Sequence, residues 1–464
     1  MTIRVYNSLS NQKEDFVPLQ AGEVKMYVCG VTVYDDIHIG HARSIIVFDM
    51  VARYLRYRGL KVTHVTNFTD VDDKIINRAN EEGVPPLELS ARYIQRYFQE
   101  VDALGVRRAD IYPKASESMH SIIQMVQQIV DRGYGYSTPD GSVYFSVDSV
   151  QDYGRLTKQK LEDMVSSGRV TLDEQKRNPM DFAIWKAAKP GEIAWDSPWG
   201  PGRPGWHIEC SAMIREHLGD LIDIHGGGSD LIFPHHENEI LQTEAAVGTK
   251  LARYWLHNGM LQFKDEKMSK SLGNFFRVRD VLQRHGRETL RFYMLNTHYR
   301  GPLGYSEEAL QEAEASLKRL WNNYRELQSY SRQGDGADPM TEALDACRQE
   351  FIAQMDDDFN TRGALSAIFQ LVRETNSAMA DSRLSSAGAI AVISLLEELD
   401  QVLGILPQDQ GSGEVDKLLE VFIQVREELR RAKMYQAADL IRDRLREVGF
   451  QLEDSGKGAK WKRI

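Results

Sequence analysis

The stretch VKMYVCGVTVYDDIHIGHARSIIVF, residues 24–48, decides the fold. Its first part, 24–33, is apolar and rich in β-branched residues, which predicts a buried strand. Its last part begins a pattern in which Ile46, Met50 and Tyr54 share one face of a helix. A short polar loop joins the two parts, so the stretch predicts a strand, a loop and a helix in succession.

The same alternation continues along the chain. KVTHVTNF, residues 61–68, predicts a second strand, and a helical run follows from Val71. Strands that alternate with helices predict an α/β fold of the Rossmann type with a parallel sheet. The alternation stops in 118–205, where we expect a hairpin around 137–141 and where 190–205 is rich in Pro and Gly. We interpret this segment as an insertion into the sheet domain.

The α/β pattern resumes after the insertion. It predicts a helix over 206–218, a short strand over 221–225, a turn at 226–228, a helix from near His235 and an apolar strand over 259–263. Amphipathic helices then follow Ser306, a good N-cap, and cover roughly 341–355, 360–379 and 386–403. The stretches 334–339 and 407–413 read as linkers, and two short basic helices and a hairpin over 450–461, turning at 455–458, end the chain.

These patterns divide the chain into domains. We expect a sheet domain in two halves, 1–118 and 205–250, around a connective insertion at 119–204. A region at 251–306 contains a lysine-rich loop, a helical bundle occupies 307–406, and a small α+β domain occupies 407–464. A chain of 464 residues is too long for one hydrophobic core, so several domains are expected on size alone.

Composition narrows the class of protein. With 42% hydrophobic and 27% charged residues, no apolar run of about 20 residues and no signal pattern at the start, we expect a cytoplasmic protein that does not enter a membrane. Three cysteines exclude a disulfide framework. The net charge of −11 excludes general affinity for nucleic acid, although 420–464 carry 11 Lys and Arg against 8 Asp and Glu. Any RNA contact must therefore be local.

Two short motifs have side chains that can stabilise the negative charge of phosphate groups. His38-Ile39-Gly40-His41 places two imidazoles at the entrance to a helix, where phosphate is attracted and where imidazoles can donate to charge that develops in nucleotidyl transfer. Lys267-Met268-Ser269-Lys270-Ser271 follows the strand at 259–263 and can neutralise a polyphosphate. Either motif alone is more typical of an ordinary polar surface. Their occurrence together, after the first and last strands of a nucleotide-binding fold, favours a catalytic site.

The cysteines point to a metal. Cys29 ends the first strand, Cys210 lies in a helix of the same domain, and His235 and Glu239 are four residues apart on one helical face. Two thiolates, an imidazole and a carboxylate are zinc donors, although His236 or Glu237 could replace its neighbour. Because the cysteines are far apart in sequence, the metal would lie beside the nucleotide site. Zinc prefers thiolate to hydroxyl, so it could select a cysteine substrate over serine.

With MYVCG at 26–30, HGGGSD at 225–230 and HHENE at 235–239, the chain resembles the cysteinyl-tRNA synthetase family of class I aminoacyl-tRNA synthetases over nearly its whole length. The resemblance implies a ligase that activates L-cysteine with ATP and Mg²⁺ and transfers it to tRNA(Cys), with one zinc ion per chain. It implies catalytic roles for His38, His41, Lys267 and Lys270, with Gly40 and Ser269 as further ATP contacts; zinc ligation by Cys29, Cys210, His235 and Glu239; and a substrate pocket that includes Cys29, Thr69, Trp206 and Asp230.

The C-terminal segment matches the anticodon-binding region of that family. Arg426, Arg430, Tyr435 and Trp461 are the expected tRNA contacts, because aromatic rings and arginines stack on unpaired bases. Many relatives carry Trp where Tyr435 stands, which affects the strength of one contact. For any single arginine, an ordinary ion pair is the more common role. Cys347 lies on an apolar helix face and is expected to pack.

Two other interpretations remain. One is the related ligase of mycothiol synthesis, which activates cysteine with ATP but passes it to the amine of a glucosaminyl-inositol; it lacks the C-terminal RNA module. The other is a non-catalytic protein that binds zinc and RNA, which the intact motifs disfavour. From the family we expect a monomer.

Overall fold

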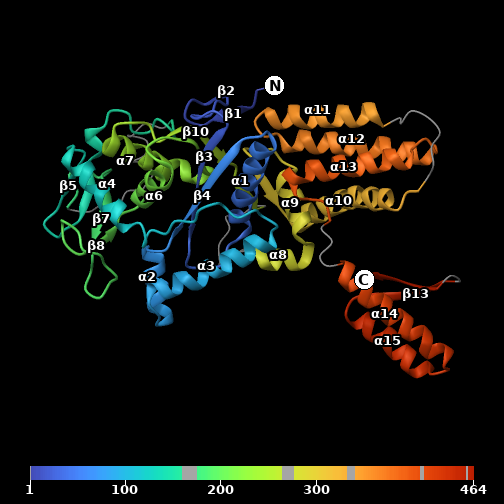
Figure 1. Ribbon diagram of the computed structural model, residues 1–464. Helices are drawn as coiled ribbons and strands as arrows, with labels where there is room; N and C mark the ends of the chain where they lie inside the picture. Colours follow the sequence, from blue (N-terminus) through green and yellow to red (C-terminus); the bar gives the residue numbers. More distant parts are fainter. Residues whose placement is uncertain are drawn as a thin grey trace. The chain divides into compact units, whose positions relative to one another are not determined.

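The computed structural model describes residues 2–158, 175–263, 276–331, 340–407, 412–455 and 458–463 (Figure 1). Lys267, Ser269 and Lys270 lie outside the described residues. The chain divides into two compact units between Leu406 and Pro407. No helix in the described ranges is long and apolar enough to cross a membrane.

A four-stranded parallel sheet forms the centre of the first unit. Its strands lie in the order β10 (Ala252–Asn258), β9 (Ile222–Gly228), β3 (Glu23–Thr32) and β4 (Lys61–Thr69). In this register Met26 of β3 lies between Ile224 of β9 and His64 of β4. The predicted α/β fold with a parallel sheet is therefore confirmed.

Two details of the predicted strands are wrong. Residues 226–228 are not a turn but the last part of β9, because each glycine leaves room for a neighbour: a Cβ atom on Gly226 would lie 2.3 Å from the ring of Phe48, and one on Gly227 would lie 2.7 Å from the ring of His236. The strand expected over 259–263 is also shorter. The edge strand β10 of the parallel sheet ends at Asn258, and the short strand β11 (Leu261–Phe263) follows it.

The helices that connect the strands in sequence pack on the sheet. They are α1 (Ile39–Tyr57), α2 (Asp73–Glu82), α3 (Pro86–Ala103), α6 (Ile208–Leu218) and α7 (Glu237–Val247); a 3₁₀ turn (η2, Ser229–Leu231) and a π turn (η3, Ile232–His236) precede α7. The helix α1 begins at Ile39, and His38 is its N-cap: the ring of His38 accepts hydrogen bonds from the backbone N–H groups of Gly40 and His41, donors that a helix start leaves unsatisfied. The large hydrophobic core includes Ile46, Met50 and Tyr54 of α1.

The inserted segment has its own small sheet and core. Helix α4 (Met119–Asp131) is followed by the antiparallel strands β5 (Gly135–Ser137), β6 (Val143–Phe145), β7 (Phe182–Ala187) and β8 (Gly202–Pro204), with a 3₁₀ turn η1 (Val147–Ser149). The predicted hairpin at 137–141 joins β5 to β6. Trp185 is completely buried in a core formed with α4, α6 and α7.

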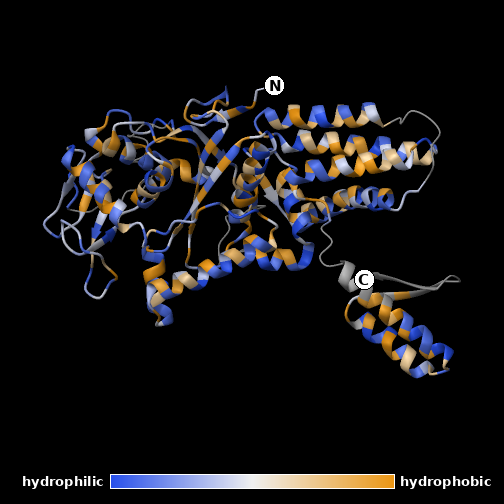
Figure 2. Ribbon diagram, viewed as in Figure 1, coloured by the Kyte–Doolittle hydropathy of each residue, from blue (hydrophilic) through white to orange (hydrophobic). Residues whose placement is uncertain are grey.

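A helical bundle completes the first unit (Figure 1). Helices α8 (Val278–His285) and α9 (Arg287–Leu295) and strand β12 (Leu303–Tyr305), which pairs with β11, lead into α10 (Glu307–Gln328), α11 (Thr341–Asp356), α12 (Thr361–Ala380) and α13 (Ser386–Leu403). The Ser306 hydroxyl caps α10 as predicted. Apolar and polar residues alternate around these helices in Figure 2, and an N-terminal hairpin, β1 (Arg4–Asn7) and β2 (Gln12–Asp15), lies against β10.

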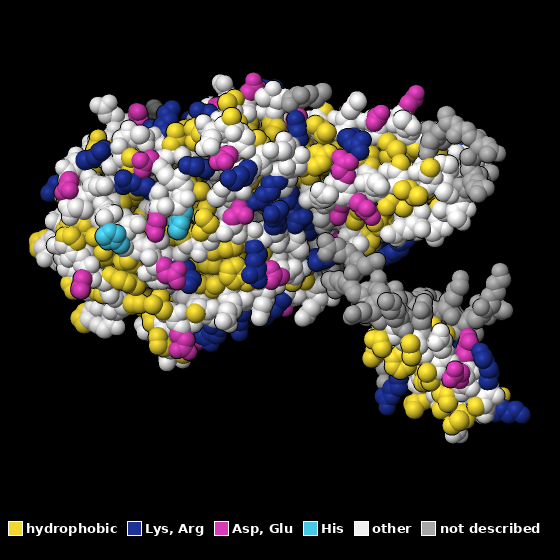
Figure 3. Space-filling view, in the orientation of Figure 1, with side chains coloured by type: hydrophobic (Ala, Val, Ile, Leu, Met, Phe, Trp, Pro, Cys, Tyr) yellow, Lys and Arg dark blue, Asp and Glu magenta, His cyan; other side chains and the backbone are white. Residues whose placement is uncertain are grey.

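The second unit consists of α14 (Ser412–Arg431), α15 (Tyr435–Glu447) and the hairpin β13 (Phe450–Ser455) and β14 (Gly458–Arg463). The expected hairpin is confirmed, but α14 has 20 residues and is longer than predicted. Apolar side chains of Leu418, Val421, Phe422 and Val425 are exposed on α14, and Figure 3 shows apolar surface on this unit.

Candidate active site and metal centre

The two signature histidines lie stacked at the start of α1. Their ring centroids are 3.7 Å apart at an angle of 23°. Nδ1 of His38 accepts from the backbone N–H of Gly40 (3.1 Å), and Nδ1 of His41 accepts from the backbone N–H of His38 (3.3 Å). Burial lowers the pKa of His38 to about 4 and, together with His38, lowers that of His41 well below its usual range. Both rings are therefore neutral near pH 7 and carry their proton on Nε2.

These histidines line a cavity of about 910 Å³. Its walls come from the end of β3, from the start of α1, and from β9, β10 and the residues that follow them. Of the residues expected in the site, Cys29, His38, Gly40, His41 and Asp230 line it. His64 of β4 and Met260, after β10, also line it. A nucleotide-sized space therefore joins the histidines to the first cysteine.

The segment that follows the lysine-rich loop returns to the same helix start. The backbone N–H of Ile39 donates to the carbonyl of Phe276 (3.1 Å), and that of Val278 donates to the carbonyl of Ile37 (3.1 Å). Residues 276–278, which directly follow the lysine-rich loop region, therefore lie against the histidine motif.

The structure brings the four expected zinc ligands together. One donor atom from each of Cys29, Cys210, His235 and Glu239 lies within 4.8 Å of the others. Sγ of Cys29 lies 3.3 Å from Nε2 of His235 and 3.5 Å from Oε1 of Glu239, and the last two atoms lie 3.3 Å apart. Cys29 belongs to β3, Cys210 to α6 and Glu239 to α7, so sheet packing assembles the cluster.

The electrostatics favour the metal-binding form in two of the four members, Cys210 and Glu239. Burial raises the pKa of the Cys29 thiol, and the carboxylate of Glu239 raises the pKa of His235 although burial opposes it. A hydrogen bond from Cys29 lowers the pKa of Cys210 to about 7, although burial opposes it. Burial alone would raise the pKa of Glu239, but His225 and His235 lower it well below its usual range. A thiolate and a carboxylate are thus favoured near neutral pH.

The structure distinguishes the alternative metal ligands of the HHENE run, His236 and Glu237, from His235 and Glu239. Oε2 of Glu237 accepts backbone N–H groups from Leu156 (2.9 Å) and Thr157 (3.0 Å), and Oε1 accepts that of Gly154 (3.1 Å). Glu237 therefore holds the insertion loop rather than facing the cluster. His236 belongs to a second possible set, with Cys29, His225 and Glu239.

Three histidines that the sequence did not single out support this region. Nε2 of His225 lies 2.9 Å from Oε2 of Glu239, His207 contacts the ring of His235, and His257 lies 2.8 Å from Nδ1 of His236. His225 belongs to the HGGGSD run at 225–230, which gives no sign that its ring contacts Glu239, and His207 and His257 have no local signal because the fold brings them to the cluster.

The expected substrate-pocket residues lie at different depths. Asp230 is exposed and lines the cavity. Trp206 is 56% exposed and stacks on His207 at 4.1 Å, which connects it to the cluster. Thr69 ends β4 opposite Thr32, which lines the cavity, and accepts a hydrogen bond from Asn67 (3.3 Å).

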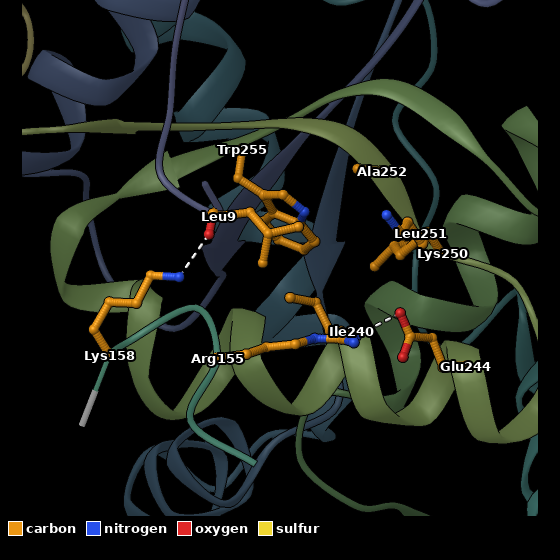
Figure 4. A pocket seen from close by; sticks show the side chains of 9 residues that line it. All are labelled: Leu9, Arg155, Lys158, Ile240, Glu244, Lys250, Leu251, Ala252 and Trp255. Carbon is orange, nitrogen blue, oxygen red and sulfur yellow. Dashed lines mark hydrogen bonds and ion pairs between the residues drawn. The ribbon is translucent and has the colours of Figure 1, made fainter. Parts of the chain in front are cut away.

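A second cavity, of about 250 Å³, is lined by residues that include Leu9, Ile240 and Trp255 (Figure 4). Trp255 lines it, and the ring of Trp255 also stacks on His225 at 4.3 Å. Around it Arg155 pairs with Glu244, and Lys158 donates to the carbonyl of Leu9 (2.6 Å). None of the expected site residues that the structure describes lines this cavity, so we assign it no part in the site.

The expected tRNA contacts differ in accessibility within the second unit. Arg430 is exposed and Tyr435 is 56% exposed, whereas Arg426 is only 2% exposed. Arg426 therefore lies inside its own unit in this structure, and its role as a tRNA contact, like those of Arg430 and Tyr435, stays a prediction. The side chain of Trp461 lies outside the described residues. Cys347 is buried among bundle helices, as expected, and burial raises its pKa to about 12.

Comparisons with known families agree with this site. A model described as "tRNA synthetases class I (C) catalytic domain" matches residues 15–315. A DALR domain model matches 350–407, which includes α12 and α13, and does not extend into α14 or α15.

Similar proteins cover the whole chain. Cysteine–tRNA ligase of Carboxydothermus hydrogenoformans is 47% identical and that of Symbiobacterium thermophilum 49% identical, each over 100% of both chains. In structure, Mycobacterium tuberculosis methionyl-tRNA synthetase in complex with methionyl-adenylate matches with a TM-score of 0.63 at 16% identity, over 86% of this chain and 94% of its own, which shows a shared fold. On this evidence the chain belongs to the cysteine–tRNA ligase family of class I tRNA synthetases.

Proposed function

We propose that this protein is a cysteine–tRNA ligase that activates L-cysteine with ATP to give cysteinyl-adenylate and then transfers the cysteinyl group to tRNA(Cys). The observation that carries the proposal is the position of Cys29. Its side chain belongs both to the thiolate-rich cluster and to the wall of the cavity that holds His38 and His41. A sulfur-recognising centre therefore borders a nucleotide-sized site.

The signature histidines would serve the activation step. The cysteine carboxylate attacks the α-phosphate of ATP, pyrophosphate leaves, and negative charge builds on the phosphate oxygens in between. Because Nδ1 of each ring accepts a backbone hydrogen bond, Nε2–H of His38 and His41 is the donor available for those oxygens. Lys267, Ser269 and Lys270 are proposed to hold the pyrophosphate, with Mg²⁺ accompanying ATP.

The metal cluster fits zinc. A tetrahedral ion with bonds of about 2.0–2.3 Å separates its ligand atoms by about 3.3–3.8 Å. The separations among the donor atoms of Cys29, His235 and Glu239 are 3.3, 3.5 and 3.3 Å, and the Cys210 sulfur lies within 4.8 Å of all three. Oε2 of Glu239 lies 2.9 Å from Nε2 of His225, so the other carboxylate oxygen, Oε1, is the one that faces Cys29 and His235. Cys29, Cys210, His235 and Glu239 offer two sulfurs, whereas the alternative set with His225 and His236 offers one. A bound zinc ion would supply selectivity for a thiolate over a hydroxyl.

The remaining substrate contacts follow from position. Asp230, at the cavity wall, is proposed to orient the amino group of cysteine by its negative charge. Trp206 and Thr69 are proposed to close the pocket at either side of Cys29. For tRNA binding, we propose that the anticodon contacts Arg430, Tyr435 and Trp461 of the unit formed by 407–464. We also propose that the protein acts as a monomer in the cytoplasm.

The full-length match does not favour the mycothiol-type ligase. The matched cysteine–tRNA ligases cover the chain to its end, including the second unit. The acceptor is therefore proposed to be RNA.

The test is transfer of labelled cysteine to acid-precipitable tRNA with ATP and Mg²⁺, with labelled serine in parallel. Charging with cysteine alone supports the proposal. Cysteine-dependent exchange of pyrophosphate into ATP without charged tRNA would indicate a small-molecule acceptor. Absence of both reactions would refute the proposed activity.

A further inference from the structure

The turn between α11 and α12 carries three consecutive aspartates that face different parts of the catalytic region. Asp356 accepts from the hydroxyl of Tyr54 on α1 (2.6 Å), and Asp357 pairs with Lys13 on the N-terminal hairpin (2.7 Å). Asp358 is completely buried. This turn lies inside the DALR-matching segment, so the helical bundle reaches the catalytic region through it.

The carboxylate of Asp358 fixes the loop between α9 and β12. Its Oδ1 accepts from the hydroxyl of Tyr299 (2.9 Å) and from the backbone N–H of Tyr6 (2.8 Å), and its Oδ2 accepts from Nε of Arg300 (2.7 Å). Asp358 has a φ of +65°, in the left-handed region that Asp and Asn tolerate better than most residues. The backbone of Asp358 therefore forms the turn between α11 and α12, and its side chain joins that turn to the loop between α9 and β12.

The same loop holds a wall of the active-site cavity. The carbonyl of Tyr299 accepts from the backbone N–H of Gly259 (2.8 Å), and the carbonyl of Met260 accepts from that of Leu303 (3.1 Å). Gly259 and Met260 both line the cavity. The approach is close, since a Cβ atom on Gly259 would lie 2.3 Å from the carbonyl oxygen of Gly301. A shift of the loop would therefore shift the wall.

The loop of residues 299–301 also forms hydrogen bonds with α1, the signature helix that begins at the His38–His41 motif. Arg43, two residues after His41, is 1% exposed, and its Nη2 donates to the carbonyls of Tyr299 (3.4 Å) and Gly301. Among the described residues, its Nε and Nη1 are buried without a hydrogen-bond partner. Within this part of the chain the buried guanidinium is held through Nη2 by those two carbonyls, so their position determines where this part of α1 lies.

We propose that Asp358 is a positioning residue for adenylate formation, because it fixes the Tyr299–Gly301 loop that holds both Arg43 of the signature helix and the Gly259 wall of the cavity. The inference rests on the proposed function. The zinc cluster lies on other elements, β3, α6, α7 and the turn before α7. Loss of the Asp358 contacts is therefore expected to affect the ATP side of the site and to spare recognition of cysteine.

The test compares Asp358→Asn with Asp357→Asn. In Asp358→Asn, Oδ1 is kept for Tyr6 and Tyr299, but an amide NH₂ meets the Arg300 donor. Asp357 is more than half exposed and supplies the matched control. In cysteine-dependent pyrophosphate exchange, Asp358→Asn should lower kcat about tenfold to a hundredfold, with the KM for cysteine and the zinc content within twofold of wild type. Asp357→Asn should match wild type in all three.

A second variant guards against misfolding. Tyr299→Phe removes only the hydroxyl that donates to Asp358 and should lower kcat by a smaller factor, and the double variant should lose less than the product of the two single losses. An unchanged kcat in Asp358→Asn overturns the inference, and so does a fall that merely follows the unfolded fraction measured by circular dichroism. A wild-type protein without cysteine-dependent exchange would instead refute the proposed function itself.

Discussion

The clearest test of the metal assignment is one substitution made at two neighbouring glutamates. Glu237 and Glu239 lie on the first turn of α7, and both are completely buried. Only Glu239 faces the cysteine and histidine donors. The change Glu→Gln preserves shape and removes the charge, so the two variants separate metal binding from structural anchoring.

The two variants should change different quantities, zinc affinity in Glu239→Gln and the free energy of unfolding in Glu237→Gln. In Glu239→Gln a zinc ligand loses its charge, and affinity should fall by at least about 100-fold, because even outer partners of metal ligands are worth about 10–100-fold. In Glu237→Gln the amide oxygen can keep the bonds from Leu156 and Thr157, but the NH₂ group faces the Gly154 N–H. One charge-assisted hydrogen bond is lost, which should cost about 1.5–3 kcal/mol of unfolding free energy.

Zinc content by mass spectrometry, chelator competition and urea unfolding measure the two effects. We expect Glu239→Gln to bind zinc weakly, and Glu237→Gln to hold one ion per chain but to unfold at lower urea. The reverse pattern, with zinc lost only in Glu237→Gln, would refute the assignment of Glu239.

Three further outcomes are expected. Cys210→Ser should abolish stoichiometric zinc and reduce discrimination of cysteine from serine in pyrophosphate exchange; retention of both would contradict metal-based recognition. Deletion of residues 414–464 should abolish tRNA charging and spare cysteine-dependent exchange, because this part belongs to a separate compact unit; loss of both reactions would assign it a folding role. Burial lowers the pKa of His64 to about 4, below the value near 6.5 of the unfolded chain, so folding opposes its protonation, and up to about 3 kcal/mol of stability should be lost as the pH falls from 6.5 to 4. Urea titrations should show a shallower loss for His64→Gln, and equal slopes would contradict this reasoning.

Much of the fold could be predicted because its signals are local. The strand at 24–33, the following helix and the bundle helices from Ser306 onward depend on periodicity and capping within single segments. The glycines at 226–228 misled the prediction because glycine usually marks a turn, whereas here it allows Phe48 and His236 to pack closely on β9. That requirement comes from distant residues.

The site divides in the same way. The cysteines, His235 and Glu239 could be proposed from donor chemistry and helical spacing, and the structure places them together. Glu237 could not be distinguished from its neighbour until the loop at 154–157 was in place, and Arg426 could not be recognised as buried from its own segment. Asp358 reaches Tyr299 and Arg300 only through the packing of the bundle.

The scattered origin of the metal cluster has a consequence for biosynthesis. Its donors occupy positions 29, 210, 235 and 239, on either side of the inserted domain. During synthesis Cys29 leaves the ribosome long before Cys210, His235 and Glu239, so the proposed zinc site could not form until Glu239 has emerged and the two halves of the sheet have paired. Zinc binding at the proposed site would thus be a late event that reports completion of the catalytic core, and a nascent chain that stops earlier would present Cys29 without the other three ligands.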